Sequence, residues 1–288
     1  MPSRANDLLS WRTRAGEWTL DFSRPIIMSI LNLTPDSFSD GGRFQNPAEA
    51  VAAALAEEAD GADMFDLGAE STRPGAQPVD EAGEWTRLAP VLTGLAQKTR
   101  RPISIDTGKA GVAEKALAAG AAVINDISAG RRDPRLFQVA AEWGAPLLLM
   151  HMRGEPATMQ ADPRYDDVIS EIHDFLLERA LAAEAAGVPR TLIWLDPGLG
   201  FGKTAEHNLS IIKHFDRVIP QGYRRVMALS RKSFLKNFLG GAPPSARDGL
   251  TAAADAISAL KGAEILRVHR AGLNRAAVDL ARAVLAAP

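Results

Sequence analysis

The chain has 288 residues, no cysteine and a formal net charge of −2. The lack of cysteine excludes disulfides, thiolate catalysis and cysteine-ligated metal, and it favours a reducing compartment, for which we take the cytoplasm. The near-zero charge gives no general attraction to nucleic acid or to a membrane surface, and no apolar run approaches the ~20 residues of a membrane span.

Short apolar runs and helix-like segments alternate along the chain. The expected strands are residues 25–31, 64–68, 102–106, 121–126, 146–152, 191–198, 224–230 and 264–269. The helices expected after them are residues 47–62, 79–97, 109–120, 133–144, 166–187, 205–215, 233–240 and 273–287. Such crossovers make neighbouring strands parallel, and eight strands can close on themselves. The pattern therefore predicts an α/β fold, a (β/α)8 TIM barrel, with an open doubly wound sheet as the alternative.

The first expected helix carries clear local signals. Asn46 is a suitable N-cap, and Gly61 ends the helical composition.

A hydrophobic content of 46% is enough for residues 25–288 to form one barrel domain around a single core. We expect residues 1–24 to be a short N-terminal extension that packs on the bottom of this barrel.

A polar or ionisable residue lies at or shortly after the end of each expected strand. These residues are Asn32, Asp66, Asp106, Asn125, His151, Asp196, Lys232 and Arg267. The C-terminal ends of TIM-barrel strands surround one mouth, where the active sites of such enzymes lie. The pattern therefore predicts an enzyme. We interpret His151 differently, as a packed and hydrogen-bonded core histidine.

The loops after the first two strands are richer in polar and turn residues than simple connectors need. Residues 32–42, NLTPDSFSDGG, are typical of a functional loop that closes over a site, with an ordinary turn as the alternative. The second loop brings the hydroxyls of Ser71 and Thr72 next to the Arg73 guanidinium. That loop is equally compatible with a helix cap and a solvated arginine.

Three later strand ends indicate a planar ligand. Asp106, Asn125 and Asp196 offer carboxylate and carboxamide groups that can bind the donor groups of a polar ring. Phe201, within the Gly-rich stretch 197–203, can lie against such a ring. Half-buried structural roles for these carboxyl groups are the alternative.

The last two strands indicate an anion site. Lys232 opens an expected helix, whose N-terminal dipole favours an anion or a carbonyl oxygen, with a solvated lysine as the alternative. Arg267 and His269 lie two residues apart and so point to the same side of a strand, at a common phosphate position of TIM barrels. No His and carboxylate triad at helical spacing supports tightly held zinc, whereas a loosely held Mg²⁺ shared with phosphate is compatible.

These stretches together resemble one family, the dihydropteroate synthases. The matching segments are ILNLTPDSFSDGG (30–42), ESTRPG (70–75), SIDT (104–107), INDI (124–127), LMHM (149–152), LDPGLGFGK (195–203), SRKS (230–233) and RVH (267–269). The resemblance implies a TIM barrel, usually a homodimer, that joins 6-hydroxymethyl-7,8-dihydropterin pyrophosphate to p-aminobenzoate and releases pyrophosphate. It also implies that sulfonamides mimic p-aminobenzoate in this site.

The resemblance assigns roles position by position. It implies pterin contacts from Asp106, Asn125, Ile127, Met150, Asp196 and Lys232. It implies p-aminobenzoate contacts from Thr72, Arg73, Pro74, Phe201, Lys232 and Ser233. Asn32 would ligate Mg²⁺ on the pyrophosphate, whose oxygens would bind Arg267 and His269. The residues expected to carry catalysis are Asp106, Lys232, Arg267 and His269.

Three positions depart from the usual pattern of the family. Ala69 and Ala228 stand where glycines are usual, and Arg270 follows RVH where the family commonly has Asp. Two alternatives therefore stay open, a non-catalytic pterin-binding paralogue and a pterin-binding methyltransferase module. The methyltransferase would not need the stretches TPDSFSDGG, ESTRPG or SRKS, which are all present.

Overall fold

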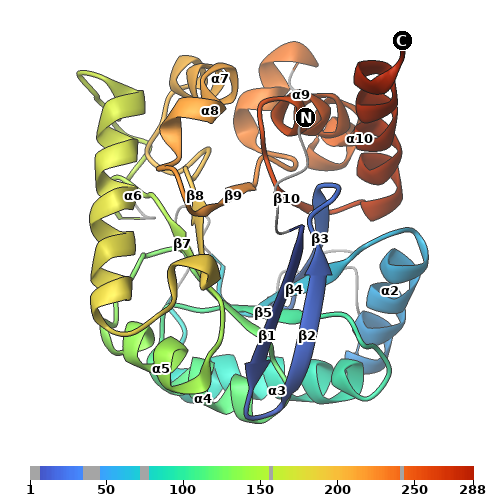
Figure 1. Cartoon of the computed structure of the whole chain (residues 1–288), viewed down its shortest axis with the longest axis vertical. Helices are drawn as coiled ribbons and strands as arrows, with labels where there is room; N and C mark the ends of the chain where they lie inside the picture. Colours follow the sequence, from blue (N-terminus) through green and yellow to red (C-terminus); the bar gives the residue numbers. More distant parts are fainter. Residues whose placement is uncertain (1–6, 35–45, 72–77, 156–157, 241–242) are drawn as a thin grey trace.

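The computed structural model describes residues 7–34, 46–71, 78–155, 158–240 and 243–288. Eight parallel strands close into a barrel in the order β10-β3-β4-β5-β6-β7-β8-β9 (Figure 1). The TIM-barrel prediction is confirmed, and the open-sheet alternative is wrong. The barrel strands are β3 (Ile26–Asn32), β4 (Met64–Gly68), β5 (Ile103–Asp106), β6 (Val123–Asp126), β7 (Leu147–Met150), β8 (Ile193–Asp196), β9 (Arg224–Met227) and β10 (Ile265–Val268).

Helices surround the barrel and bury its outer face. Asn46 caps the first of them as expected, because its side chain accepts a hydrogen bond from the Glu49 amide. The α-helices are α2 (Pro47–Ala59), α3 (Glu81–Ala96), α4 (Ala110–Ala118), α5 (Arg135–Trp143), α6 (Val168–Ala185), α7 (Ala205–Lys213), α8 (Phe215–Val218), α9 (Asp248–Leu260) and α10 (Ala271–Ala286). Within the described ranges, no helix is both long and apolar enough to cross a membrane.

The segment after β9 differs from the prediction. Instead of a helix over 233–240, Ser233–Phe238 forms a six-residue 3₁₀ turn, and the helix that covers this strand is α9. The sequence continues into Gly240-Gly241 and Pro243-Pro244, and these residues cannot extend a helix. Gly240 itself adopts φ +58°, a left-handed conformation that suits glycine.

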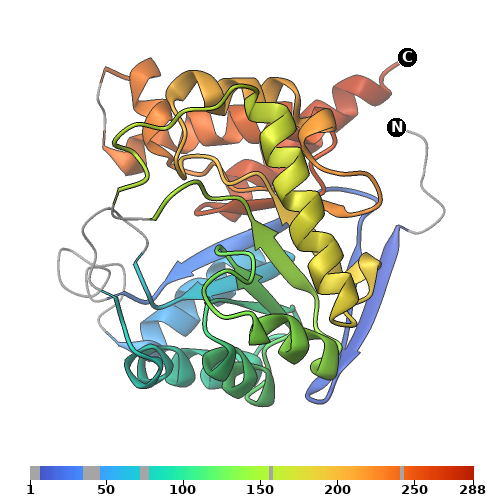
Figure 2. The ribbon, with the colours of Figure 1, turned by 90° about the vertical axis from the view of Figure 1, so that its left-hand side faces the viewer.

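A two-stranded hairpin precedes the barrel and lies across it (Figure 1). Its strands are β1 (Leu8–Thr13) and β2 (Gly16–Asp21). The Trp11 indole donates a hydrogen bond to the Ala122 carbonyl, 3.1 Å away, and its ring packs edge-on against the Trp194 ring. Ala122 directly precedes β6, and Trp194 lies near the start of β8. The hairpin therefore covers the end of the barrel at which the strands begin, and Figure 2 shows it along one edge of the molecule.

Candidate active site

Strand register brings a group of polar side chains together at the opposite end of the barrel, the mouth. Gly68 pairs with Asp106 across β4 and β5, and Asp106 pairs with Asn125 across β5 and β6. Paired residues on neighbouring strands point to the same face of a sheet. Asp106 and Asn125 therefore lie side by side, and Gly68 leaves the space next to the Asp106 carboxyl group open.

Arg267, from β10, connects these side chains. Its Nε donates to Asp66 Oδ2 at 2.6 Å, and a terminal nitrogen donates to Asp106 Oδ2 at 3.0 Å. The Asn125 amide donates to the same Asp66 oxygen at 3.0 Å. We call these four residues, Asp66, Asp106, Asn125 and Arg267, the mouth cluster.

One oxygen of the mouth cluster is not satisfied. Asp66 is fully buried, and its Oδ1 has no hydrogen-bond partner among the described residues. A buried carboxylate oxygen without a donor costs free energy, which the ion pair of the other oxygen with Arg267 offsets in part. Asp66 was noticed in the sequence only as a strand end, and the ion pair with Arg267 now makes it a central member of the site.

Burial also changes the protonation of this cluster. It raises the pKa of Asp106 to about 7, against the opposing effect of the Arg267 guanidinium and with a further increase from the Asp66 charge. Burial would lower the pKa of Arg267, but the Asp66 and Asp106 carboxylates raise it above its ordinary value. Perturbed carboxyl groups of this kind are typical of functional sites, where a ligand supplies the missing interactions.

A third carboxyl group faces the mouth from β8. Asp196 is buried and pairs in register with Met150 of β7. Burial raises the pKa of Asp196 to about 6, although the Gly198 amide, which donates at 2.7 Å, and Lys232 act in the opposite direction. The neighbouring wall is apolar. Met150, Met152 and Met159 form a buried group, against which Ile127 and Phe201 pack.

Lys232 approaches the same site from the segment after β9. Its Nζ lies 4.0 Å from the centre of the Phe201 ring, a cation–π geometry. Burial lowers the pKa of Lys232 to about 8, against the raising effect of Asp196. The predicted helix-dipole contribution at Lys232 is wrong, since only the short 3₁₀ turn follows it. The exposed Ser233 begins that turn.

The chain is similar to known proteins over most of its length. The pterin binding enzyme family matches residues 28–269. The chain is 43% identical to the dihydropteroate synthase of Streptococcus pyogenes serotype M6, over 86% of this chain and 91% of that protein. It is 40% identical to the mitochondrial folate synthesis bifunctional protein of Arabidopsis thaliana, over 94% of this chain, but spans only 51% of that longer protein.

Solved structures of dihydropteroate synthases have the same fold as this chain. The Yersinia pestis dihydropteroate synthase in complex with a sulfonamide drug superposes with a TM-score of 0.90 at 39% identity, over 97% of this chain and all of that one. The Xanthomonas albilineans dihydropteroate synthase with 4-aminobenzoic acid gives 0.89 at 40% identity, with the same coverage. The chain belongs to the dihydropteroate synthase family.

The positions that the family resemblance selected fall partly inside and partly outside the described residues. Thr72, Arg73 and Pro74 lie outside the described residues, and so do residues 35–42 of the first loop. Asn32 is exposed at the end of β3, in register with Gly68. The structure thus brings the mouth cluster, Asp196, Met150, Phe201 and Lys232 to one end of the barrel of this dihydropteroate synthase family member.

The two expected phosphate ligands lie in different settings. Arg267 is within β10, but β10 ends at Val268, so His269 lies beyond the strand. That the two side chains point to the same side stays a prediction, since His269 lies one residue past the last paired residue of β10. The backbone amide of His269 donates to the Ser230 hydroxyl, which also lies 2.9 Å from His269 Nδ1.

The departure at Arg270 has a local compensation. Arg270 occupies the N-cap of α10 and provides no side-chain cap, so the first amide of the helix needs another acceptor. Glu57, from α2, accepts a hydrogen bond from the Ala271 amide at 2.6 Å. A carboxylate from a neighbouring helix thus holds the segment after β10, where the family usually places its own Asp.

Lys203 and His151 form a buried pair that sequence reasoning found only in part. Lys203 Nζ donates to the carbonyl oxygens of Gly198 and Phe201 at 2.9 and 3.1 Å and lies 2.9 Å from His151 Nδ1. Burial and the Lys203 charge lower the pKa of His151 far below its ordinary value, so the ring is neutral. His151 is the packed core histidine that we expected, and Lys203 shapes the turn that presents Phe201.

Proposed function

We propose that this protein is a dihydropteroate synthase, which condenses 6-hydroxymethyl-7,8-dihydropterin pyrophosphate with p-aminobenzoate to give 7,8-dihydropteroate and pyrophosphate in folate biosynthesis. The mouth cluster is the observation that supports this best. A pterin presents amino and ring N–H donors along one edge, and the carboxylates at the mouth are suited to accept hydrogen bonds from them.

The residues at the mouth divide the work by their chemistry. Asp106 and Asp196 accept hydrogen bonds from the pterin edge, the Asn125 amide fixes its register, and Asp66 holds Arg267 and Asn125 in place. Met150 and Phe201 border the ring plane. Binding by several fixed groups in a site of low polarity orients the substrate and excludes water from its reactive carbon.

The reaction needs no protein nucleophile. The bond between the pterin methylene carbon and the pyrophosphate oxygen breaks, and the p-aminobenzoate nitrogen bonds to that carbon and loses a proton. Arg267 and His269 stabilise the charge that develops on the departing pyrophosphate, as positioned cations and donors do in such sites. We assign Lys232 and Ser233 to p-aminobenzoate binding, the role that the family resemblance also implies for Thr72, Arg73 and Pro74.

Mg²⁺ is the metal that this proposal requires. Among the described residues no group of three or more His, Cys, Asp or Glu could hold a metal. We propose that the ion is held mainly by pyrophosphate oxygens and water, with the exposed amide of Asn32 as its protein ligand. When bound there, Mg²⁺ would neutralise charge on the leaving group.

We also propose that the protein is a cytoplasmic homodimer whose partners are small-molecule substrates. Helices α9 and α10 pack together and expose large apolar side chains: Ile257, Leu260, Leu273, Leu280, Val284 and Leu285. On α10 the positions 273, 280 and 284 recur at helical spacing, so they form one stripe. An exposed apolar stripe of this kind is typical of an interface, and Leu280→Asp should give a monomer in sedimentation experiments.

A pyrophosphate-release assay tests the proposed activity. The purified protein, supplied with pterin pyrophosphate and Mg²⁺, should release pyrophosphate and form dihydropteroate only when p-aminobenzoate is present. Tight pterin binding without p-aminobenzoate-dependent turnover would support the non-catalytic paralogue instead. Methyl transfer from methyltetrahydrofolate to a corrinoid, with no dihydropteroate formed, would support the methyltransferase module.

A further inference from the structure

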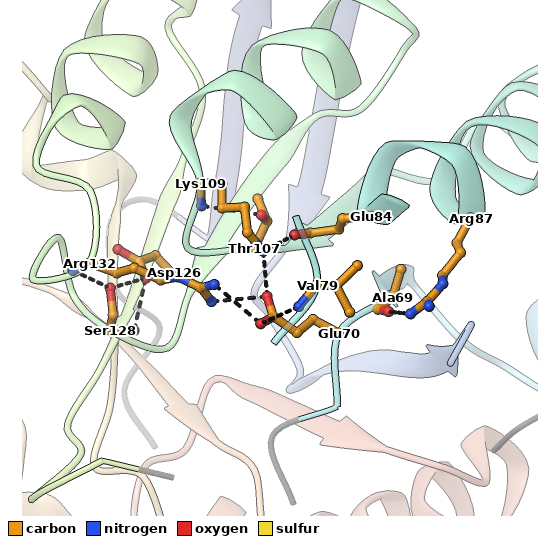
Figure 3. A network of polar contacts seen from close by, with 10 residues as sticks. All are labelled: Ala69, Glu70, Val79, Glu84, Arg87, Thr107, Lys109, Asp126, Ser128 and Arg132. Atoms are coloured by element: carbon orange, nitrogen blue, oxygen red, sulfur yellow. Dashed lines mark hydrogen bonds and ion pairs between the residues drawn. The ribbon is translucent and has the colours of Figure 1, made fainter. Parts of the chain in front are cut away.

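A charged cluster lies just outside the mouth and connects three consecutive strand ends (Figure 3). Glu70 follows β4, Lys109 follows β5, and Arg132 lies in the loop after β6. The strands before them carry Asp66, Asp106 and Asn125 of the mouth cluster. We call Glu70, Lys109 and Arg132 the Glu70 cluster.

Glu70 is the centre of this cluster. The two terminal nitrogens of Arg132 donate to its two carboxylate oxygens at 2.9 and 3.2 Å, and Lys109 Nζ donates at 2.5 Å. Bidentate pairing of this kind fixes orientation as well as distance. Lys109 is itself buried and donates to the buried Glu84 of α3 on its other side. Lys109 is therefore held between two carboxylates.

The loop after β6 is shaped so that Arg132 reaches Glu70. The Asp126 carboxylate accepts from the Ser128 hydroxyl at 2.7 Å, and that hydroxyl oxygen accepts from the Arg132 amide at 3.2 Å. The Arg132 side chain then passes over Gly108, where an added Cβ would lie 3.0 Å from Arg132 Cδ. Asp126 directly follows Asn125, so this chain of contacts begins next to the mouth cluster.

Glu70 also joins the two ends of one loop. It directly precedes Ser71, and its Oε1 accepts a hydrogen bond from the Val79 amide at 3.4 Å. The residues between these points include Thr72, Arg73 and Pro74, which the proposed function assigns to p-aminobenzoate. Burial would raise the pKa of Glu70, but hydrogen bonds from Arg132 and Lys109 lower it, so the carboxylate stays charged at neutral pH.

We propose that Glu70 is a positioning residue for the second substrate: through Arg132 and Lys109 it fixes both ends of the 71–78 loop to the strand ends that bind the pterin. The proposal rests on the proposed function. It predicts that p-aminobenzoate affinity depends on the Glu70 cluster, although none of its three side chains belongs to the mouth cluster. Pterin binding should not depend on it.

Steady-state kinetics with matched variants test this. Arg132→Met and Glu70→Gln should each raise the KM for p-aminobenzoate about tenfold or more, while the KM for pterin pyrophosphate changes less than about twofold, since small misplacements of a binding group are costly. Arg132→Lys should restore part of the loss. The double variant should be no worse than the poorer single variant, because both changes break one contact.

Arg87→Met is the matched control. Arg87 of α3 donates to the Ala69 carbonyl at 3.0 Å, one residue before Glu70, but takes no part in the Glu70 cluster (Figure 3). This variant should leave both KM values unchanged. Equal changes in the two KM values, or none, in folded Arg132→Met would overturn the proposal. Because the Arg132 side chain is 43% exposed, this variant should fold even if Glu70→Gln does not. A wild-type protein without p-aminobenzoate-dependent turnover would instead refute the proposed function.

Discussion

Two arginines, one at each end of the barrel, pair with aspartates in different ways. At the end where the strands begin, Arg275 donates to Asp63 and, at 2.9 Å, to the Pro25 carbonyl. Both Asp63 oxygens have partners, since Arg24 and the Ile27 amide also donate to them. At the mouth, Arg267 pairs with two aspartates, and one Asp66 oxygen has no partner within the described part of the chain.

This difference indicates that the lower end of the barrel serves stability and that the mouth serves ligand binding. The lower end is covered by the hairpin and completes the hydrogen bonds of its buried carboxylate, which favours the folded state. The mouth concentrates carboxyl groups whose pKa is raised by the low-polarity surroundings, as for Asp106 and Asp196. A site that keeps such groups costs stability and gains ligand affinity, a common compromise in enzymes.

The largest expected effect comes from exchanging the two arginines for methionine. Arg267→Met removes the cation shared by Asp66 and Asp106 and the donor to pyrophosphate, so kcat/KM should fall about 100- to 1,000-fold. Arg275→Met should leave kcat/KM of the folded protein nearly unchanged and destabilise it by about 3–5 kcal/mol, because Asp63 loses its buried partner. Pyrophosphate-release kinetics and urea unfolding on both variants check this, and equal kinetic losses would refute the division.

The hairpin offers a second contrast. Trp11→Ala removes a buried ring from the covered end together with its hydrogen bond to Ala122, and should cost about 3–5 kcal/mol of unfolding free energy. Both KM values should stay the same, because the mouth lies at the other end of the barrel. Chemical denaturation gives the first quantity and kinetics at a permissive temperature the second. A raised KM with unchanged stability would contradict the account.

Stability should depend on pH through the mouth. Burial raises the pKa of Asp196 from 3.8 to about 6 and that of Asp106 to about 7. The two protonated carboxyl groups contribute fully to the unfolding free energy below their pKa in the unfolded chain. This contribution is lost as the pH rises through their pKa values in the folded protein. Between pH 5 and pH 8 the unfolding free energy should therefore fall by roughly 1 kcal/mol or more per group. Asp196→Asn, which cannot titrate, should show a shallower dependence in urea unfolding.

The smallest expected effect is at the start of α10. Arg270→Asp would supply the side-chain N-cap that the helix lacks and should stabilise the protein by about 0.5–1 kcal/mol. The gain should be larger when combined with Glu57→Gln, because the Ala271 amide then has a weaker acceptor. A double-mutant cycle measured by thermal unfolding checks this. Additive effects would mean that Glu57 does not replace the cap.

The sequence predicted the barrel and much of the mouth, because both follow from periodicity. Asp106, Asn125 and Asp196 end apolar runs, and parallel strands bring such ends together. The sequence predicted the ends of individual helices and strands less well. The turn at Ser233–Phe238 and the last residue of β10 depend on how the chain packs, which local propensity does not determine.

Buried lysines were the main functional-site residues that the sequence did not predict. Lys203 and Lys109 look like surface lysines in the sequence, yet both are buried and fully engaged. Whether a lysine is buried depends on acceptors from distant segments, such as the Glu70 carboxylate. The position of Lys203 at the end of a Gly-rich stretch was the one local sign, since tight turns leave carbonyl groups that need donors.

Asp196→Asn tests most directly the claim that the mouth is built for a ligand. The Asp196 carboxylate accepts hydrogen bonds from the pterin edge. In the asparagine variant, an NH2 donor replaces one of the two acceptor oxygens. Calorimetric titration with a pterin that lacks the pyrophosphate should show at least about tenfold weaker binding, while the unfolding free energy at pH 8 stays the same or rises. Unchanged pterin affinity together with a loss of stability would show that Asp196 is structural and would contradict the account.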